Sequence, residues 1–165
     1  MARDSHYSRQ VGALAFRSTA SGDPEMLVLT SRGTKRFIIP KGWPVKGLSD
    51  GEAAAKEAYE EGGVIGKVRE TLIGSYSYWK RLERSFAYVT VDVYALKVKT
   101  QLADWPERRS RERAWLAPEA AAQLVDEPEL ITLIRDFGAR RARVHRSAAP
   151  TQERRPVRRR QAAGP

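Results

Sequence analysis

The sequence predicts a single α/β domain. It has 165 residues, of which 41% are hydrophobic and 30% charged, which is the size and mixture of one compact domain with one core. Short runs rich in β-branched and aromatic residues predict strands, and two segments with helical character predict helices. We therefore expect one β-sheet packed against helices.

Three apolar runs in the first 40 residues predict strands. Residues 11–16 and 26–30 are separated by Ser-Gly-Asp-Pro at positions 21–24, a turn sequence in which Gly and Pro supply the bend. A third run, residues 37–39, stops at Pro40. The Gly and Pro residues at positions 42, 44 and 47 then predict an irregular loop up to Ser49.

A helix is predicted to begin after this loop. Ser49 and Glu52 have the spacing of a capping box, in which the hydroxyl and the carboxylate each accept a hydrogen bond from an otherwise unpaired backbone N–H. The Ala-rich stretch that follows favours helix. Gly62 and Gly63 predict its end, because a helix often ends at a residue in the left-handed conformation that Gly adopts readily.

The second half of the chain predicts long strands and then a helix. Residues 64–78 and 86–98 are rich in β-branched and aromatic residues, and a charged connection at residues 80–84 joins them. Residues 113–116 predict a further strand. The apolar positions of the expected C-terminal helix recur at i, i+3, i+4 and i+7, and they are Leu130, Leu133, Ile134 and Phe137.

Positive charge is concentrated at the C-terminus. Residues 140–165 hold nine Arg against Glu153 alone, and so carry +8 of the formal net charge of +10. This segment also loses most large apolar residues. We therefore expect an N-terminal extension over residues 1–9, a domain over residues 10–139 and a disordered basic tail over residues 140–165. The tail is interpreted either as a nucleic-acid-binding segment or as a solubilising extension.

The composition excludes several kinds of site. The chain has no Cys, which excludes disulfides, thiolate metal sites and a Cys nucleophile. Its two His residues, His6 and His145, lie near the chain ends, which argues against a Ser/His/Asp triad or a His-ligated zinc site. No apolar run approaches the roughly 18 residues that span a bilayer, and the polar start lacks a signal-peptide core. We expect a cytoplasmic protein.

Three glutamates on the first predicted helix form a candidate metal site. Glu57, Glu60 and Glu61 lie at i, i+3 and i+4, so their carboxylates project from one strip of the helix surface. Their repulsion is relieved if a hard divalent cation lies among them, since carboxylate oxygens are the ligands that Mg²⁺ prefers. The alternative is a solvated acidic face, which is common on exposed helices.

A cluster of cations directly precedes this acidic helix. Residues 31–48 contain five cations and no acid, namely Arg32, Lys35, Arg36, Lys41 and Lys46. Cations beside a metal site suit a substrate with several phosphates, which the cations hold while the metal bridges its oxygens. The alternative is that these cations decorate a solvated loop.

Residues 42–64, with the sequence GWPVKGLSDGEAAAKEAYEEGGV, resemble the Nudix box. That box is a Gly, five residues, Glu, seven residues, and then Arg-Glu-aliphatic-x-Glu-Glu-x-Gly-aliphatic. The matching positions, aligned without gaps, are Gly42, Glu57, Ala58, Glu60, Glu61, Gly63 and Val64. The order of expected strands and helices over residues 11–137 also suits this family.

The resemblance implies a Nudix α/β/α sandwich, in which a mixed β-sheet lies between helices. It further implies hydrolysis of a diphosphate linkage by a metal-activated water, with Glu57, Glu60 and Glu61 binding Mg²⁺ or Mn²⁺ and Lys56 orienting them. By the same resemblance Glu57, Glu61 and Lys56 are the catalytic residues. The general base is left open, and its candidates are Glu61, Glu52, Glu83 and Glu112.

Two positions depart from the box. Lys56 stands where the family has Arg, which keeps the charge but loses the bidentate fork. Leu48 stands where the family has its first Glu, so either Asp50 or Glu52 substitutes for it or metal binding is weakened.

The cations suggest a substrate class. Pro40-Lys41-Gly42 resembles the entry of diadenosine polyphosphate hydrolases, and residues 32–46 resemble the diphosphoinositol polyphosphate phosphohydrolase branch. Arg32, Lys35, Arg36, Lys41, Gly42 and Lys46 are therefore the expected substrate-binding residues. Two alternatives stay open: a catalytically weak Nudix-fold binding module, and an RNA 5′-pyrophosphohydrolase that uses the basic tail.

Overall fold

The computed structural model describes residues 8–148 of the chain. Its elements, in chain order, are β1 (Ser8–Ser18), β2 (Pro24–Thr30), β3 (Phe37–Ile38), β4 (Lys41–Gly42), α1 (Asp50–Gly62), β5 (Val64–Arg81), β6 (Phe86–Gln101), β7 (Arg113–Leu116), α2 (Pro118–Leu124) and α3 (Pro128–Ala148).

Within residues 8–148 the strands form one mixed sheet of seven strands. Its main path runs β3-β2-β1-β6-β5, while β4 pairs with β1 and β7 pairs with β2. The β1–β6 pairing is parallel, and every other pairing of named strands in residues 8–148 is antiparallel. The parallel pair lies at the centre of the sheet, with β5 and β6 as a long antiparallel hairpin beside it.

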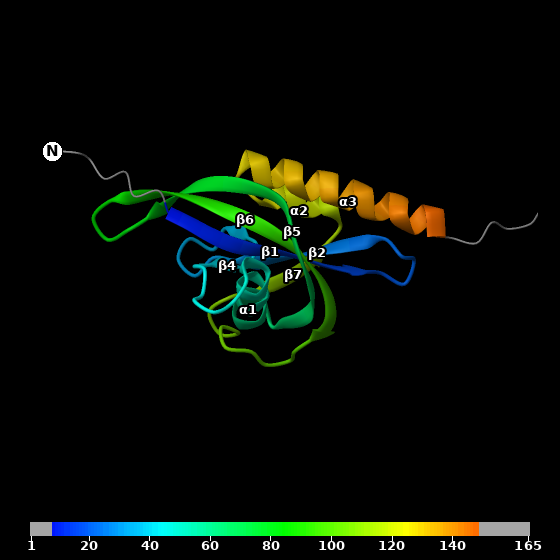
Figure 1. Ribbon diagram of the computed structural model, residues 1–165, viewed down its shortest axis with the longest axis horizontal. Coiled ribbons are helices and arrows are strands. Elements are labelled where there is room, and N and C mark those ends of the chain that lie inside the picture. The colour runs from blue at the N-terminus through cyan, green and yellow to red at the C-terminus, as the bar shows by residue number, and fades with distance from the viewer. Residues whose placement is uncertain (1–7, 149–165) are drawn as a thin grey trace, which may run out of the picture.

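Helices cover both faces of the sheet (Figure 1). Helix α1 lies on one face, and α2 and α3 lie side by side on the other. Each face has its own core: Ala54, Ala58 and Val64 belong to the cluster under α1, while Ile134 and Phe137 belong to the cluster under α3. The predicted α/β/α sandwich with a mixed sheet is therefore confirmed.

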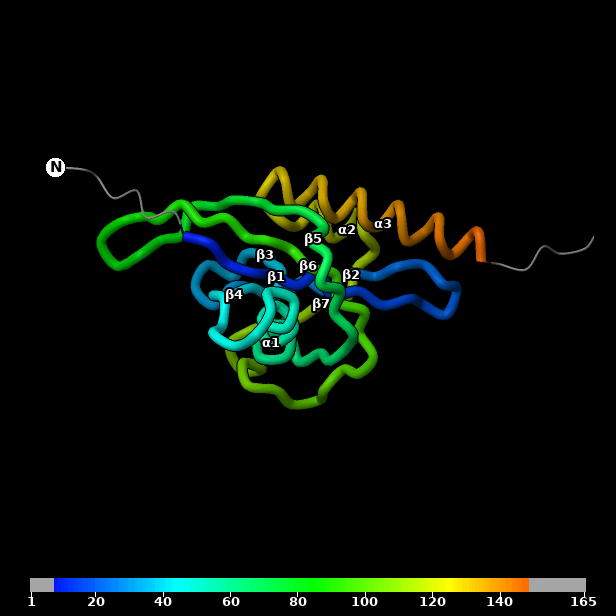
Figure 2. The backbone as a smooth tube through the Cα atoms, in the orientation of Figure 1, coloured from blue at the N-terminus to red at the C-terminus, as the bar shows by residue number. Residues whose placement is uncertain are grey.

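Most predicted elements are present, and the sheet is more extensive than the sequence indicated. Strands β5 and β6 end at Arg81 and Gln101, three residues beyond each predicted end, and the hairpin that they form projects past the rest of the sheet (Figure 2). Strand β4 lies inside the stretch predicted to be irregular, because it pairs with Val11 and Gly12 of β1. Helix α2 was not predicted; Pro118 stands at its start, where the fixed φ of Pro suits a helix.

The C-terminal boundary is corrected by α3. The predicted apolar positions of this helix are buried, but the helix continues to Ala148, so residues 140–148 are helical where a disordered tail was expected. Arg140 and Arg141 lie over the rings of Phe137 and Phe16 at 6.0 and 4.9 Å, and such contacts let a basic segment pack although it has few apolar residues. At the other end, residues 8 and 9, expected in the N-terminal extension, belong to β1.

The remainder of the predicted extension and tail, residues 1–7 and 149–165, lies outside the described residues. Within residues 8–148, no helix is long and apolar enough to cross a membrane.

Candidate active site

Helix α1 is fixed at both ends. The Ser49 hydroxyl accepts a hydrogen bond from the Glu52 N–H, and the Glu52 carboxylate accepts one from the Ser49 N–H, so the predicted capping box is confirmed. At the other end Gly63 has a φ of 63° and donates its N–H to the Tyr59 carbonyl at 3.0 Å. A side chain there would meet the Trp105 ring, so both conformation and space favour Gly. The rigid helix sets the direction of its glutamates.

Gly42 brings the loop backbone against Glu57. It is buried in β4, and a Cβ atom built on it would lie well inside van der Waals contact with the Glu57 carboxylate. The absence of a side chain at position 42 therefore lets this carboxylate pack on the β4 backbone. This is the structural counterpart of the first Gly in the predicted motif.

Glu61 is buried and paired with a cation that the sequence analysis did not identify. Its side chain accepts a hydrogen bond from Arg111 Nη2 at 2.9 Å and another from the Lys41 backbone N–H at 3.2 Å. Glu61 is 6% exposed and Arg111 8%. Burial raises the pKa of Glu61 to about 7, against the opposing effect of Arg111 and Lys41. Glu61 is thus held in one orientation at the end of α1.

The other two glutamates are more accessible. Glu60 forms an ion pair with Lys56 one turn earlier on α1, so Lys56 does contact one of the glutamates it was expected to orient. Glu57 is half-buried, and its pKa is raised by burial and by the negative charges of Glu60 and Glu107. Repulsion among these acids favours a cation between them.

The predicted metal ligands fit a divalent cation in chemistry, although they are not gathered around one point. Among residues 8–148, no group of three His, Cys, Asp or Glu side chains is clustered closely enough to hold a metal ion as arranged. Glu60 pairs with Lys56 and Glu61 with Arg111, whereas Glu57 forms none of the ion pairs found within residues 8–148, although Lys56 and Arg111 lie near it. Mg²⁺ prefers oxygen donors, and Glu57 is the one of the three glutamates whose carboxylate is best placed to bind it.

The two carboxylates proposed to replace the missing acid at position 48 are engaged elsewhere. Asp50 pairs with Arg9 of β1 and accepts a hydrogen bond from Tyr94 at 3.4 Å. Glu52 caps the helix. Leu48 itself is 40% exposed in the turn before α1. Neither substitute is free in this conformation, so the site has one carboxylate fewer than the motif it resembles.

Two of the predicted substrate-binding cations meet at one aromatic ring. Lys41 Nζ lies 5.0 Å from the centroid of the Tyr78 ring, and the Arg36 guanidinium lies 5.9 Å from it. The Tyr78 hydroxyl donates to Gln10 at 2.8 Å, which fixes the ring. Burial and the neighbouring cations Lys80, Arg111 and Arg36 lower the pKa of Lys41, with Glu61 opposing them. Arg36 is also paired with Asp126 at 3.3 Å and Glu127 at 2.9 Å, so the positive charge beside Glu61 that suits an anionic ligand comes mainly from Lys41 and Lys80.

The aromatic hairpin extends this basic site. Lys80 Nζ of β5 lies 4.8 Å from the centroid of the Trp43 ring, which follows β4 in the chain. Trp43 is 48% exposed, so its ring is available to a ligand and is not core packing. Lys80 therefore continues the line of cations formed by Arg36 and Lys41 towards the hairpin tip, with the Trp43 ring beside it.

The remaining predicted cations lie elsewhere. Arg32 is 3.6 Å from a carboxylate oxygen of Glu107, and Lys35 donates to the Ser110 carbonyl at 3.4 Å, so both reach the loop between β6 and β7. Lys46 is exposed in the loop before α1. The structure thus groups Arg36 and Lys41 at one end and Arg32 and Lys35 at the other, and not all five around one point.

The loop between β6 and β7 supplies residues that the sequence analysis missed. It passes beside α1 (Figure 2), and the Glu107 N–H donates to the Glu60 carbonyl at 3.0 Å. The Glu107 carboxylate accepts a hydrogen bond from Arg111 at 3.2 Å and lies near Glu57. Neither Arg111 nor Glu107 stands out in a charged loop sequence. A buried carboxylate such as that of Glu61 needs a cation as its partner, and this requirement is the signal that could have indicated Arg111.

The fold and the glutamate-bearing helix resemble those of Nudix proteins. Searched against protein-family models, it matches none. It is 36% identical over 109 residues to an Arabidopsis thaliana protein named Nudix hydrolase 12, mitochondrial, covering 61% of this chain and 51% of that one. It is 33% identical over 121 residues to the rat diphosphoinositol polyphosphate phosphohydrolase 2, covering 72% of this chain and 63% of that one.

Solved structures show the same fold. A C. elegans Ap4A hydrolase in a binary complex superposes with a TM-score of 0.61 at 22% identity, covering 82% of this chain and 98% of that one. A Nudix hydrolase from Nitrosomonas europaea gives a TM-score of 0.60 at 19% identity, covering 82% and 90%. The chain spans 51–65% of the length of its curated relatives. The similarity to Nudix proteins is thus found in both sequence and fold.

Proposed function

We propose that this protein hydrolyses a diphosphate linkage in a small molecule that carries several phosphates, of the diphosphoinositol polyphosphate or diadenosine polyphosphate type. The observation that carries the proposal is the line of cations formed by Arg36, Lys41 and Lys80, which begins beside the carboxylates of α1. The similarity to the phosphohydrolases of this class supports it.

Each group has a role in this proposal. Glu57, Glu60 and Glu61 would hold Mg²⁺ or Mn²⁺, which when bound activates a water and neutralises charge on the phosphates. Arg36, Lys41 and Lys80 hold the substrate phosphates by charge-assisted hydrogen bonds.

The surrounding groups keep these residues in position. Arg111 keeps the Glu61 carboxylate in one orientation through its 2.9 Å hydrogen bond. Gly42 lets the Glu57 carboxylate lie against the β4 backbone. The exposed face of Trp43 offers a stacking surface to a base or another apolar part of the substrate.

The general base is part of the proposal. Glu61 is buried and bonded to Arg111, so its proton-accepting oxygens are largely occupied. Glu107 accepts a side-chain hydrogen bond from Arg111 and lies near Glu57, so it joins the candidates Glu52, Glu83 and Glu112. Glu52 caps α1, whereas the contacts of Glu107 with Arg111 and Arg32 both use Oε1 and leave Oε2 to accept a proton, so Glu107 is better placed than Glu52 or Glu61.

A catalytically weak binding module is the second candidate. It is favoured by two observations: Leu48 leaves the acidic cluster one carboxylate short, and Lys56 is bonded to Glu60 by a single ammonium group. An RNA 5′-pyrophosphohydrolase is the third, and it depends on the basic segment of residues 140–165, of which residues 149–165 lie outside the described structure.

A substrate panel separates these candidates. Diphosphoinositol polyphosphate, diadenosine polyphosphates and 5′-triphosphorylated RNA are incubated with the full chain and Mg²⁺ or Mn²⁺, and the phosphate-containing products are identified. Turnover of the first two in preference to RNA supports our proposal. Tight binding without turnover of any substrate supports the binding module, and preferred release of diphosphate from RNA supports the third candidate.

A further inference from the structure

A second basic pocket lies between α3 and the sheet, away from the carboxylates. It has a volume of ≈ 270 Å³ and is lined by Phe16, Lys67, Arg69, Lys97 and Arg141. These residues come from β1, β5, β6 and α3. Every polar side chain in this lining is a cation.

Two of these cations face each other across the hairpin. Lys67 of β5 and Lys97 of β6 are direct partners in the strand register, and Lys97 is in turn the partner of Phe16 in β1. Like charges directly opposite on neighbouring strands are destabilising. A bound anion would remove that repulsion.

The other cations add to this charge without a compensating acid. Arg141 reaches down from α3 and lies 4.9 Å from the Phe16 ring centroid. None of the ion pairs found between residues 8 and 148 involves any of the four cations that line the pocket. Their charge is therefore available to a ligand.

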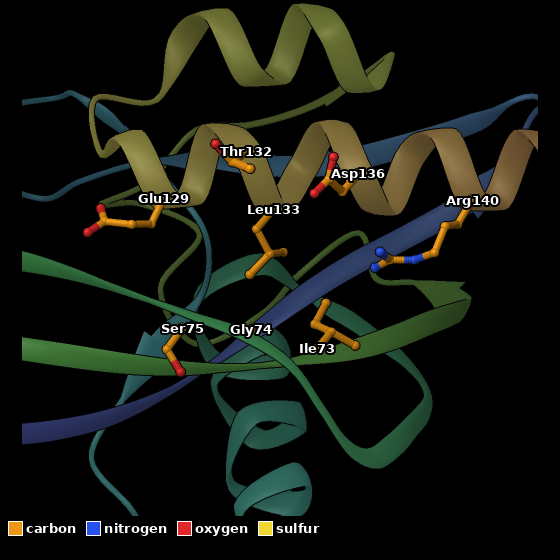
Figure 3. Close-up of a pocket in the computed structure, with 8 residues that line it drawn as sticks. All are labelled: Ile73, Gly74, Ser75, Glu129, Thr132, Leu133, Asp136 and Arg140. Atoms are coloured by element: carbon orange, nitrogen blue, oxygen red, sulfur yellow. The ribbon is translucent and has the colours of Figure 1, made fainter.

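The basic pocket continues into a neighbouring one of ≈ 210 Å³, which shares Phe16, Arg69 and Arg141 with it and adds Arg140. On its other side Arg140 lines a third pocket, between α3 and β5, together with Glu129 and Asp136 (Figure 3). That third pocket holds acids and the first two do not. The anion-attracting region thus ends at Arg140.

This pocket is separate from the candidate active site. Lys97 lies eight residues along β6 from Val89, the strand partner of Tyr78, a separation of about 26 Å at about 3.3 Å per residue. None of the residues that line it contributes to the carboxylate site. One small ligand cannot occupy both places.

We propose that this pocket binds a small anion that carries adjacent phosphate groups. Four cations from three elements converge on a space close to the about 300 Å³ at which small-molecule pockets begin, and Arg clusters of this kind hold phosphates by paired hydrogen bonds. An extended nucleic acid would instead need cations spread along a track. The inference does not depend on the proposed hydrolase activity.

The test uses inorganic tripolyphosphate as the probe and the full chain with metal removed by a chelator. Isothermal titration should resolve two binding events in the unaltered chain, one at each basic site. Lys67→Gln with Lys97→Gln should weaken one of them by at least about tenfold, since the probe then has two fewer charge-assisted hydrogen bonds. Arg36→Gln with Lys41→Gln should remove the other event, so failure of the active-site proposal is seen separately.

A matched control removes the same charge from the same region. Lys99→Gln with Arg143→Gln changes two cations, one on β6 and one on α3, that do not line either basic pocket. This variant should keep both binding events. Equal weakening by the control and the test variant would mean that only net charge matters, and the proposal would be overturned.

Loss of folding should not explain weaker probe binding by the variant with Lys67→Gln and Lys97→Gln. Removal of the Lys67–Lys97 repulsion should leave the melting temperature unchanged or higher in the absence of probe. Arg69→Gln with Arg141→Gln is a second test of the same pocket and should weaken the same event. Single-stranded RNA binding is measured on the same variants. Unchanged tripolyphosphate binding in both variants would overturn the small-ligand site. A decrease in RNA binding alone would also overturn it and would make this face a nucleic-acid surface.

Discussion

Arg111 donates to Glu61 at 2.9 Å, and both side chains are more than nine-tenths buried. This pair joins the end of α1 to the loop before β7. Arg111→Met would leave Glu61 buried without its cation, and breaking a buried pair in this way costs about 3 to 5 kcal/mol. We expect the free energy of unfolding in urea to fall by that amount.

The control for this prediction is Arg111→Met combined with Glu61→Leu, which removes both charges. Most of the stability should return, because an apolar pair of similar volume replaces the ion pair. If Arg111→Met alone costs less than about 1 kcal/mol, the pair is not a structural link.

Glu57→Gln and Glu61→Gln should each lower kcat severely, but their effects on stability should differ. Glu57 is half-buried and its carboxylate is not engaged by a cation, so Gln should leave the fold unchanged. Glu61→Gln weakens the charge-assisted bond to Arg111, worth about 1.5 to 3 kcal/mol, so that variant should also be less stable. Urea denaturation and steady-state rates at saturating Mg²⁺ measure the two effects.

The ligand assignment fails if either variant keeps near-native kcat at saturating metal. Glu119→Gln serves as the control, because Glu119 lies on α2 and pairs with Arg135 of α3 on the surface. It should keep full activity.

Most helices and strands and the position of the glutamates were predicted because they depend on local patterns, and the sandwich was implied by the resemblance to the Nudix box. The capping box at Ser49, the Gly at position 63 and the apolar spacing of α3 each act over a few residues. What the sequence missed depends on contacts between distant segments. Arg111 is 50 residues from Glu61, and nothing local distinguishes it from the other arginines of its loop.

The same reason explains the error at residue 140. Composition predicted a disordered tail, because Arg and Ala dominate there. In the structure Arg141 packs on Phe16, which lies 125 residues earlier in the chain, and the helix continues to Ala148. The prediction from composition was wrong for residues 140–148, because the aliphatic stems of Arg side chains can cover aromatic rings and so replace apolar residues in packing.

Gly42→Ala should reduce activity by placing a methyl group against the Glu57 carboxylate. The added Cβ would force that side chain to move, and a displacement of about 1 Å in a catalytic group can cost about 100-fold in rate. Gly33→Ala is the matched control, because a Cβ at Gly33 meets nothing within 4 Å. We expect a large fall in kcat only in the first variant. Equal rates would show that Glu57 does not need its place on β4.

Leu48→Glu should strengthen metal binding. Leu48 is exposed just before α1, and the acids nearest in sequence, Asp50 and Glu52, are bonded to Arg9 and to the Ser49 backbone. A carboxylate at position 48 adds an oxygen donor beside α1, where the carboxylates of Asp50 and Glu52 are already bonded. Titration of Mg²⁺ or Mn²⁺ should show a lower Kd, and Leu48→Gln should not. An unchanged Kd would mean that position 48 lies too far from the metal.

Truncation after Ala148 should spare the fold and the hydrolysis of small substrates but weaken any RNA binding. The cut keeps α3 intact, including Arg140 and Arg141, and removes the last 17 residues with five Arg and one Glu. For every phosphate that the tail neutralises, its removal should lower the slope of log affinity against log salt by about 0.7 for a single strand. RNA binding measured from low to high salt in both forms should therefore converge at high salt.

If truncation instead abolishes turnover of diadenosine or inositol substrates while circular dichroism is unchanged, the tail contributes to the active site. Equal RNA affinity and equal salt slopes in the two forms would place the nucleic-acid surface on the domain itself.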